Sequence, residues 1–251
     1  MKSLFAAFRF LTVIPLPAAL GDTEADLEKS VYFFPVVGLA LGAILSALDA
    51  ALLAILPVLP ASGALVLVLA ALTGGLHLDG LGDTADGFMS ARPRERVLEI
   101  MKDSRTGPMG VTAISFALIM KTALLASVTG PYRPAMIVLM PVAGRSAMVM
   151  LMGVLPYIRP EGGMGGLFMP RRSLVRSLWG FVFILAAGWA LAGWPGVAAG
   201  LASATGAALA ACRVHQRIGG VTGDTLGAVC EIVEPIPLLV TAIFIQRGLI
   251  A

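Results

Sequence analysis

Long apolar runs alternate with short polar segments along the whole chain. Each run is close to the ~20 residues that a helix needs to cross the hydrocarbon core of a bilayer. The pattern predicts seven membrane-spanning helices, near residues 32–56, 62–79, 109–129, 134–155, 176–194, 196–212 and 235–250. We therefore expect an all-α fold, a polytopic transmembrane helical bundle of about seven spans that forms a single integral-membrane domain over residues 1–251.

The first twenty residues predict a helix of another kind. Apolar and basic positions fall on opposite helical faces, with Leu4, Phe5, Phe8 and Leu11 on one and Lys2 and Arg9 on the other. Because Arg9 interrupts the apolar run, a cleaved signal peptide is the less favoured interpretation. We expect a short N-terminal amphipathic helix at the membrane surface.

Composition and charge support the same class. The chain has 251 residues, of which 58% are hydrophobic and only 13% are charged, whereas soluble domains carry about a quarter charged residues. With a cytoplasmic N-terminus, the predicted spans place fourteen of the 18 Lys and Arg residues on the cytoplasmic side, as the positive-inside rule requires. The net charge of +3 therefore reflects topology. The expected partner is a lipid bilayer and not a nucleic acid.

The stretch 74–88, GGLHLDGLGDTADGF, concentrates polar chemistry at the end of an apolar run. If it is helical, Asp79, Asp83 and Asp86 stand at i, i+4 and i+7 and share one face. Three such carboxylates repel one another, and a cation bound among them would offset this repulsion. Aspartate oxygens are suitable ligands for Mg²⁺. A solvated polar turn is the alternative. His77 is a candidate general base, because imidazole titrates near pH ~6.5, or a hydrogen-bonding residue.

Two further segments carry candidate site residues. Residues 80–108 end in a glycine-rich helix start beside Lys102, Asp103 and Arg105, which favours a phosphate site over an ordinary surface loop. Residues 213–231 contain Asp224, which either caps a helix or, with Glu231 on the same face, completes the aspartate site.

Charged residues inside apolar spans usually face the interior of the bundle. Arg145 either supports the acidic cluster or binds a substrate phosphate. Lys121 either snorkels to the surface or pairs with Asp49, which lies at a comparable depth. Functional and structural roles stay open for both. In the loop 156–176, four glycines within five residues predict either a flap that covers a ligand or a plain flexible loop. Cys212 and Cys230 lack metal-ligand spacing and predict free thiols.

Three motifs in order, GGLHLDGLGDTADGF, EIMKDSRTGPMGV and GGVTGDTLGAVCE, resemble the cobalamin synthase family, the adenosylcobinamide-GDP ribazoletransferases. The segments FLTVIPLP and YFFPVVGLALG resemble the family's opening, so the likeness covers nearly the whole chain. Gly82 departs from the alanine of many members, which should not matter at a small position. The resemblance implies an integral-membrane enzyme of the cell inner membrane whose active site faces the cytoplasm.

By the same resemblance, the enzyme joins adenosylcobinamide-GDP to α-ribazole or α-ribazole 5′-phosphate, releases GMP and needs Mg²⁺. Phosphoryl transfer depends mainly on positioning and charge neutralisation. The catalytic candidates are His77, Asp79, Asp83 and Asp86. The metal-ligand candidates are Asp79, Asp83 and Asp86, with Asp224 weaker. The substrate-binding candidates are Lys102, Asp103, Arg105, Arg145 and Asp224.

Two other functions compete with this one. A CDP-alcohol phosphotransferase of lipid synthesis also uses aspartates at the membrane edge, but its motif needs an alanine–arginine pair that is missing after Asp79-Gly80. A cation-coupled transporter would place acids at mid-membrane, where the predicted spans leave only Asp49. The oligomeric state, including a homo-oligomer, stays open.

Overall fold

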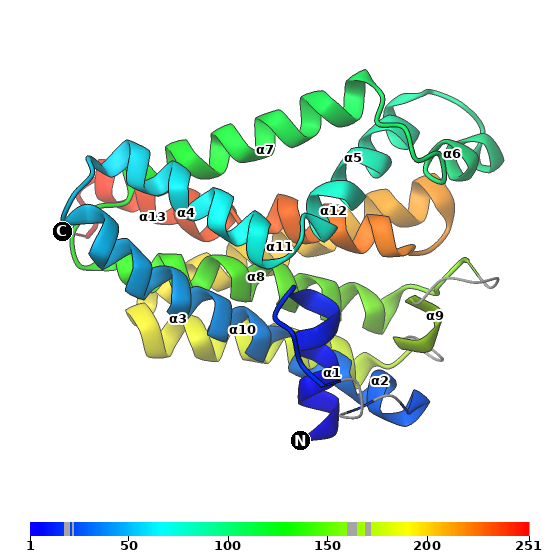
Figure 1. Ribbon diagram of the computed structural model, residues 1–251, viewed down its shortest axis with the longest axis horizontal. Helices are drawn as coiled ribbons and strands as arrows, with labels where there is room; N and C mark the ends of the chain where they lie inside the picture. Colours follow the sequence, from blue (N-terminus) through cyan, green and yellow to red (C-terminus); the bar gives the residue numbers. More distant parts are fainter. Residues whose placement is uncertain (18–20, 22, 160–164, 169–171, 251) are drawn as a thin grey trace.

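The computed structural model describes residues 1–17, 21, 23–159, 165–168 and 172–250. Its helices are α1 (Lys2–Leu11), α2 (Glu24–Ser30), η1 (Val31–Phe33), α3 (Phe34–Leu53), α4 (Val58–Leu72), α5 (Leu76–Met89), α6 (Arg94–Ile100), α7 (Pro108–Ser127), α8 (Tyr132–Val154), α9 (Gly165–Phe168), α10 (Leu174–Ala192), α11 (Trp194–Ile218), α12 (Gly223–Val233) and α13 (Ile236–Gln246). The long helices lie side by side along the longest axis, and α5, α6 and α9 lie at the end away from the C-terminus (Figure 1). The expected all-α fold is confirmed.

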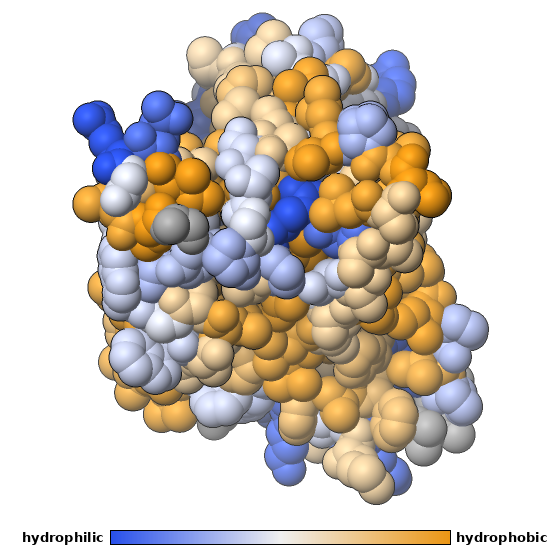
Figure 2. All heavy atoms as spheres, turned by 90° about the vertical axis from the view of Figure 1, so that its left-hand side faces the viewer, coloured by the Kyte–Doolittle hydropathy of each residue, from blue (hydrophilic) through white to orange (hydrophobic). Residues whose placement is uncertain are grey.

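The bundle has the dimensions of a multi-pass membrane protein. Within the described ranges, six helical segments are long and apolar enough to span a bilayer, and a seventh is added if α4 and α5 count together. Large apolar side chains such as Phe116, Ile119 and Trp189 are exposed on the outer faces, as expected for helices that contact lipid. Apolar atoms also cover much of the end of the molecule seen in Figure 2, with hydrophilic atoms in a central recess and at the edges.

Three predicted boundaries were wrong in an informative way. The span expected at 62–79 is α4, and the chain then bends by 91° into α5. Gly74 and Gly75 make this turn at φ of 61° and 71°, which glycine adopts without strain. The sixth span, expected to end at 212, continues as α11 to Ile218. The seventh, expected to begin at 235, begins twelve residues earlier with α12 at Gly223.

The most deeply buried helix is α8, and α3 packs closely along it. A Cβ added to Gly38 would lie 2.7 Å from the carbonyl oxygen of Pro141. A Cβ added to Gly42 would lie 2.6 Å from the Cα of Val138. Small residues at such contacts allow the backbones of membrane helices to approach each other.

Replacing Gly42 by alanine should therefore separate α3 from α8. We expect the free energy of unfolding to fall by about 1–3 kcal/mol, the usual cost of overpacking, in a denaturant titration in detergent. The control is Gly63→Ala, because a Cβ at Gly63 meets only a methyl group of Thr122, at 3.6 Å. Equal stability of both variants would contradict the close-packing interpretation.

The predicted N-terminal helix is present as α1. It buries Ala6, Ala7 and Leu11, and the ring of Phe10 lies 5.8 Å from that of Phe34, between ring centroids. The helix therefore packs on the bundle with part of its apolar face. In the predicted flap, residues 160–164 lie outside the described part of the chain. Both cysteines are free thiols, as expected.

Candidate active site

The three aspartates of the first motif lie on one helix, as their spacing predicts. Asp79 is exposed on α5, whereas Asp83 and Asp86 are half-buried. The helix packs almost backbone to backbone against α12, because a Cβ on Gly80 would lie 2.7 Å from the carbonyl oxygen of Asp224. This glycine contact places Asp224 within electrostatic range of Asp79.

Arg159 joins this group and was not anticipated from the sequence. Its Nη2 atom lies 2.9 Å from Oδ2 of Asp224. A short parallel bridge holds the preceding residues in place, since the Ile158 N–H donates to the Val221 carbonyl at 3.1 Å. The cap of α12 is Thr222, which accepts from the Thr225 N–H. Asp224 is therefore free of the capping role that the sequence left open for it.

The cluster of Asp79, Asp83, Asp224 and Arg159 carries excess negative charge. Asp79 and Asp224 repel the carboxylate of Asp83, and Arg159 attracts it. Yet no three His, Cys, Asp or Glu side chains of the described residues converge closely enough to hold a metal by themselves. The arrangement suits a divalent cation that takes one or two carboxylates and completes its shell with water or substrate oxygens, as Mg²⁺ does.

Asp86 has a different environment from the other acids. Its Oδ2 accepts the Gly107 N–H at 2.6 Å and its Oδ1 accepts the Gly110 N–H at 2.9 Å. A Cβ on Gly107 would lie 2.6 Å from Oδ1 of Asp86, so glycine makes room for the carboxylate. Asp86 thus accepts hydrogen bonds from two N–H groups at the start of α7, where the first turn of a helix offers the backbone no acceptor. Its assignment as a metal ligand stays a prediction.

The change Asp86→Asn should destabilise the protein. The amide would place an N–H group against one of the two backbone donors, leaving that donor without an acceptor. We expect a loss of about 1–3 kcal/mol in the free energy of unfolding, measured by denaturant titration. The control is Glu24→Gln, which alters an exposed acid in the first turn of α2 and should change stability little. A stable Asp86→Asn variant would contradict the anchoring role.

Lys102, Asp103 and Arg105 lie exposed between α6 and α7. Arg105 Nη2 donates to Asp103 at 2.8 Å, and the side-chain hydrogen bond to Arg105 lowers the pKa of Asp103 to about 2. These two residues pair with each other rather than with the aspartates of α5. Their contact with substrate stays a prediction.

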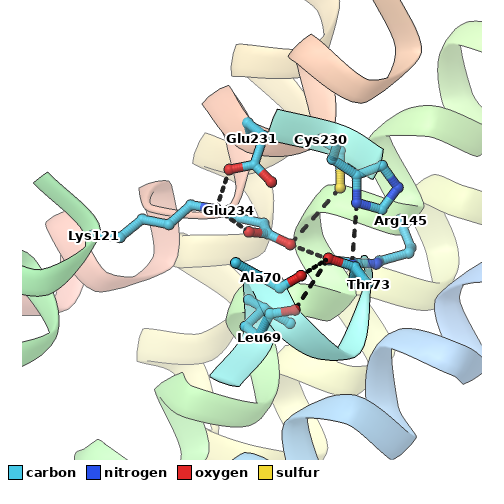
Figure 3. A network of polar contacts seen from close by, with 9 residues as sticks. Leu69, Ala70, Thr73, Lys121, Arg145, Cys230, Glu231 and Glu234 are labelled. Atoms are coloured by element: carbon cyan, nitrogen blue, oxygen red, sulfur yellow. Dashed lines mark hydrogen bonds and ion pairs between the residues drawn. The ribbon is translucent and has the colours of Figure 1, made fainter. Parts of the chain in front are cut away.

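A buried polar network joins residues of α5, α7, α8 and α12, and Figure 3 shows its charged side chains. The Nζ atom of Lys121 lies 2.5 Å from Glu231 and also binds Glu234. Arg145 binds Glu234 as well, and its Nη2 lies 3.3 Å from Nδ1 of His77. Two cations and two carboxylates therefore balance in this interior. We call these four charged residues with His77 the buried network.

The buried network corrects several expectations. Lys121 does not pair with Asp49, which instead binds Arg133 at 2.7 and 2.8 Å. Glu231 binds Lys121 and does not complete the aspartate site. Arg145 is fully buried and contacts the network rather than the acids of α5. Asp49 is also not the only acid deep in the bundle, because Glu231 and Glu234 are buried there too. Both glutamates already bind Lys121 or Arg145, so they do not support a site for a transported cation.

Two cavities adjoin the aspartates. One of about 220 Å³ is lined by apolar side chains and by His77, Asp79, Arg159 and Asp224. A second, more open one of about 620 Å³ shares Asp79 and Phe10 with the first. Asp79 therefore lies where an acidic surface meets an apolar interior, which can bring a metal-bound phosphate next to an apolar group.

Comparison with known proteins gives a consistent result. The sequence signature of the family described as cobalamin-5-phosphate synthase matches residues 3–242. A protein of Geotalea daltonii named adenosylcobinamide-GDP ribazoletransferase is 36% identical over 95% of this chain and 96% of its own length. A protein of the same name from Clostridium novyi is 35% identical over 100% of both chains. Another from Klebsiella pneumoniae is 40% identical over 95% of this chain and 98% of its own length. No solved structure matches the chain.

Proposed function

Since this chain belongs to the cobalamin-5-phosphate synthase family, whose members are enzymes of cobalamin synthesis, we propose that it joins adenosylcobinamide-GDP to α-ribazole or α-ribazole 5′-phosphate. A hydroxyl oxygen of the α-ribazole substrate bonds to the phosphorus on the cobinamide side of the diphosphate, and the hydroxyl proton is released to water. The bond from that phosphorus to the oxygen of GMP breaks, so GMP leaves and adenosylcobalamin or its 5′-phosphate remains. The supporting observation is the cluster of Asp79, Asp83 and Asp224 with Arg159 at the edge of the cavity.

In this proposal the acidic residues bind the metal ion and the basic residues bind phosphate groups. One or two of the carboxylates of Asp79, Asp83 and Asp224 would hold Mg²⁺ on the diphosphate, and the bound ion would neutralise phosphate charge. Arg159 lies beside them and stabilises negative charge that develops on the departing GMP. Lys102 and Arg105, on the exposed loop after α6, attract the phosphates of the incoming nucleotide.

The direct experiment incubates purified protein with adenosylcobinamide-GDP, α-ribazole and Mg²⁺. We expect GMP to appear together with adenosylcobalamin, and neither product to form when Mg²⁺ is removed by a chelator. Omitting α-ribazole should also stop GMP release. GMP formation without α-ribazole would indicate a hydrolase and contradict the transferase assignment.

The active site should lie on the cytoplasmic side of the inner membrane. Most basic residues are expected at the same end of the bundle as the active site, and loops rich in Lys and Arg stay in the cytoplasm. In a variant without Cys212 and Cys230, we expect Arg92→Cys to resist an impermeant thiol reagent added to intact cells. Ile55→Cys, between α3 and α4, should react. The reverse labelling pattern would invert the topology.

A further inference from the structure

The cavity of about 220 Å³ beside the aspartates has an apolar part that the phosphate chemistry does not use. Three rings from distant segments meet in its lining. The ring centroid of Phe10 lies 4.4 Å from that of Phe168 and 5.8 Å from that of Phe34. Met148 and Met152 from α8 also line it. Such a lining binds a planar, apolar group by stacking and sulfur contacts.

The size and polarity of the cavity narrow the class of ligand. Pockets for drug-sized molecules begin near ~300 Å³, so this cavity holds a fragment such as a fused bicyclic ring and is too small for a corrin macrocycle. Both proposed substrates bring a heteroaromatic base. Guanine has several N–H and C=O groups, which would be costly to bury in the apolar part of the cavity because the Phe and Met side chains there offer them no partners. The dimethylbenzimidazole of α-ribazole has two methyl groups and a single free ring nitrogen, which suits apolar walls.

His77 supplies one polar group for that nitrogen. Arginine has donors only, so Nδ1 of His77, 3.3 Å from Arg145 Nη2, accepts the hydrogen bond. The neutral imidazole then carries its proton on Nε2. The side chain is 1% exposed, and among the described residues Nε2 has no hydrogen-bond partner. His77 therefore carries a buried, unsatisfied N–H donor rather than the lone pair of a general base, and the residue is one of those that line the cavity.

We propose that this cavity is the subsite for the heteroaromatic base of α-ribazole. The base lies among Phe10, Phe34 and Met152, and its free ring nitrogen accepts a hydrogen bond from Nε2 of His77. Arg145, fixed by Glu234, is a positioning residue that sets the tautomer of His77. This inference rests on the proposed function, since it names the part of the acceptor substrate that enters the cavity.

A matched pair of ligands tests the hydrogen bond. The binding of α-ribazole and of its indole analogue, in which a C–H group replaces the free ring nitrogen, is measured by calorimetry without turnover. The parent should bind α-ribazole about tenfold more tightly, the value of one good hydrogen bond. His77→Phe should bind the two ligands equally. Discrimination that persists in a folded His77→Phe variant, or is missing in the parent, overturns the assignment.

A matched pair of variants tests the location. Met152→Phe fills the cavity, whereas Met120→Phe adds the same bulk to a separate groove beside α7. We expect Met152→Phe to raise the KM for α-ribazole at least about tenfold, with less than a twofold change for adenosylcobinamide-GDP, and Met120→Phe to change neither. A rise for adenosylcobinamide-GDP instead would place guanine in the cavity and overturn the proposal. Selective α-ribazole binding without GMP release would contradict the proposed function alone.

Discussion

Replacing Asp79 or Asp83 by asparagine should lower the turnover number at least about 100-fold, comparable to losing one strong electrostatic stabiliser of the transition state. Each change keeps the shape of the side chain and removes one negative charge that would hold Mg²⁺. The melting temperature of the metal-free protein should stay the same or rise, because Asp83 is repelled by Asp79 and Asp224. Turnover is measured at saturating Mg²⁺, and melting is measured in detergent.

The melting temperatures of Asp79→Asn and Asp83→Asn should respond less to Mg²⁺ than that of the parent. Mg²⁺ should raise the melting temperature of the parent but not of either variant, since only a ligand that binds the folded state stabilises it. The control is Glu95→Gln, which changes an exposed acid on α6 and should behave like the parent. Variants that keep parental turnover and the full Mg²⁺ shift would remove these aspartates from the site.

Lys121→Met should cost about 3–5 kcal/mol in the free energy of unfolding, because it leaves two buried carboxylates with one cation. Lys121 is 3% exposed and contacts both Glu231 and Glu234. Adding Glu231→Gln restores the charge balance, so the double variant should recover most of the loss. A denaturant titration in detergent measures all three proteins.

The coupling between the two changes separates charge balance from packing. Neighbouring residues in one ion-pair network show strongly non-additive effects, so the double variant should be more stable than Lys121→Met alone. Lys102→Met, which alters an exposed lysine, should change stability little. A double variant as unstable as Lys121→Met would show that the buried network does not act through charge balance.

Most helices could be predicted from the length of the apolar runs, and the acidic face of α5 could be predicted from the spacing of its aspartates. The start of α12 could not be predicted in this way, because Asp224, Glu231 and Glu234 make its segment look polar. Inside the fold, Lys121 and Arg145 neutralise the two glutamates, so the segment can enter the bundle. Local hydropathy cannot reveal a partner that lies 110 residues away.

Arg159 shows the same limit at the candidate site. In the sequence it is one basic residue after an apolar run, and nothing nearby marks it for chemistry. Its position depends on the bridge between Tyr157 and Val221 and on its contact with Asp224. Glycines in the sequence were a better local signal of the site than Arg159. A Cβ added to Gly80 would contact Asp224, and a Cβ added to Gly107 or Gly110 would contact Asp86.

The wide sequence separation within the buried network also bears on how the protein is made. Lys121 and Arg145 leave the ribosome 110 and 89 residues before Glu231 and Glu234, respectively. At ~5–20 residues per second, α7 and α8 wait on the order of ten seconds in or beside the translocon with cations that lack their carboxylate partners. The final membrane insertion step therefore completes the charge balance of the interior, and a nascent chain that stops before Glu231 exposes two unpaired cations to membrane quality control.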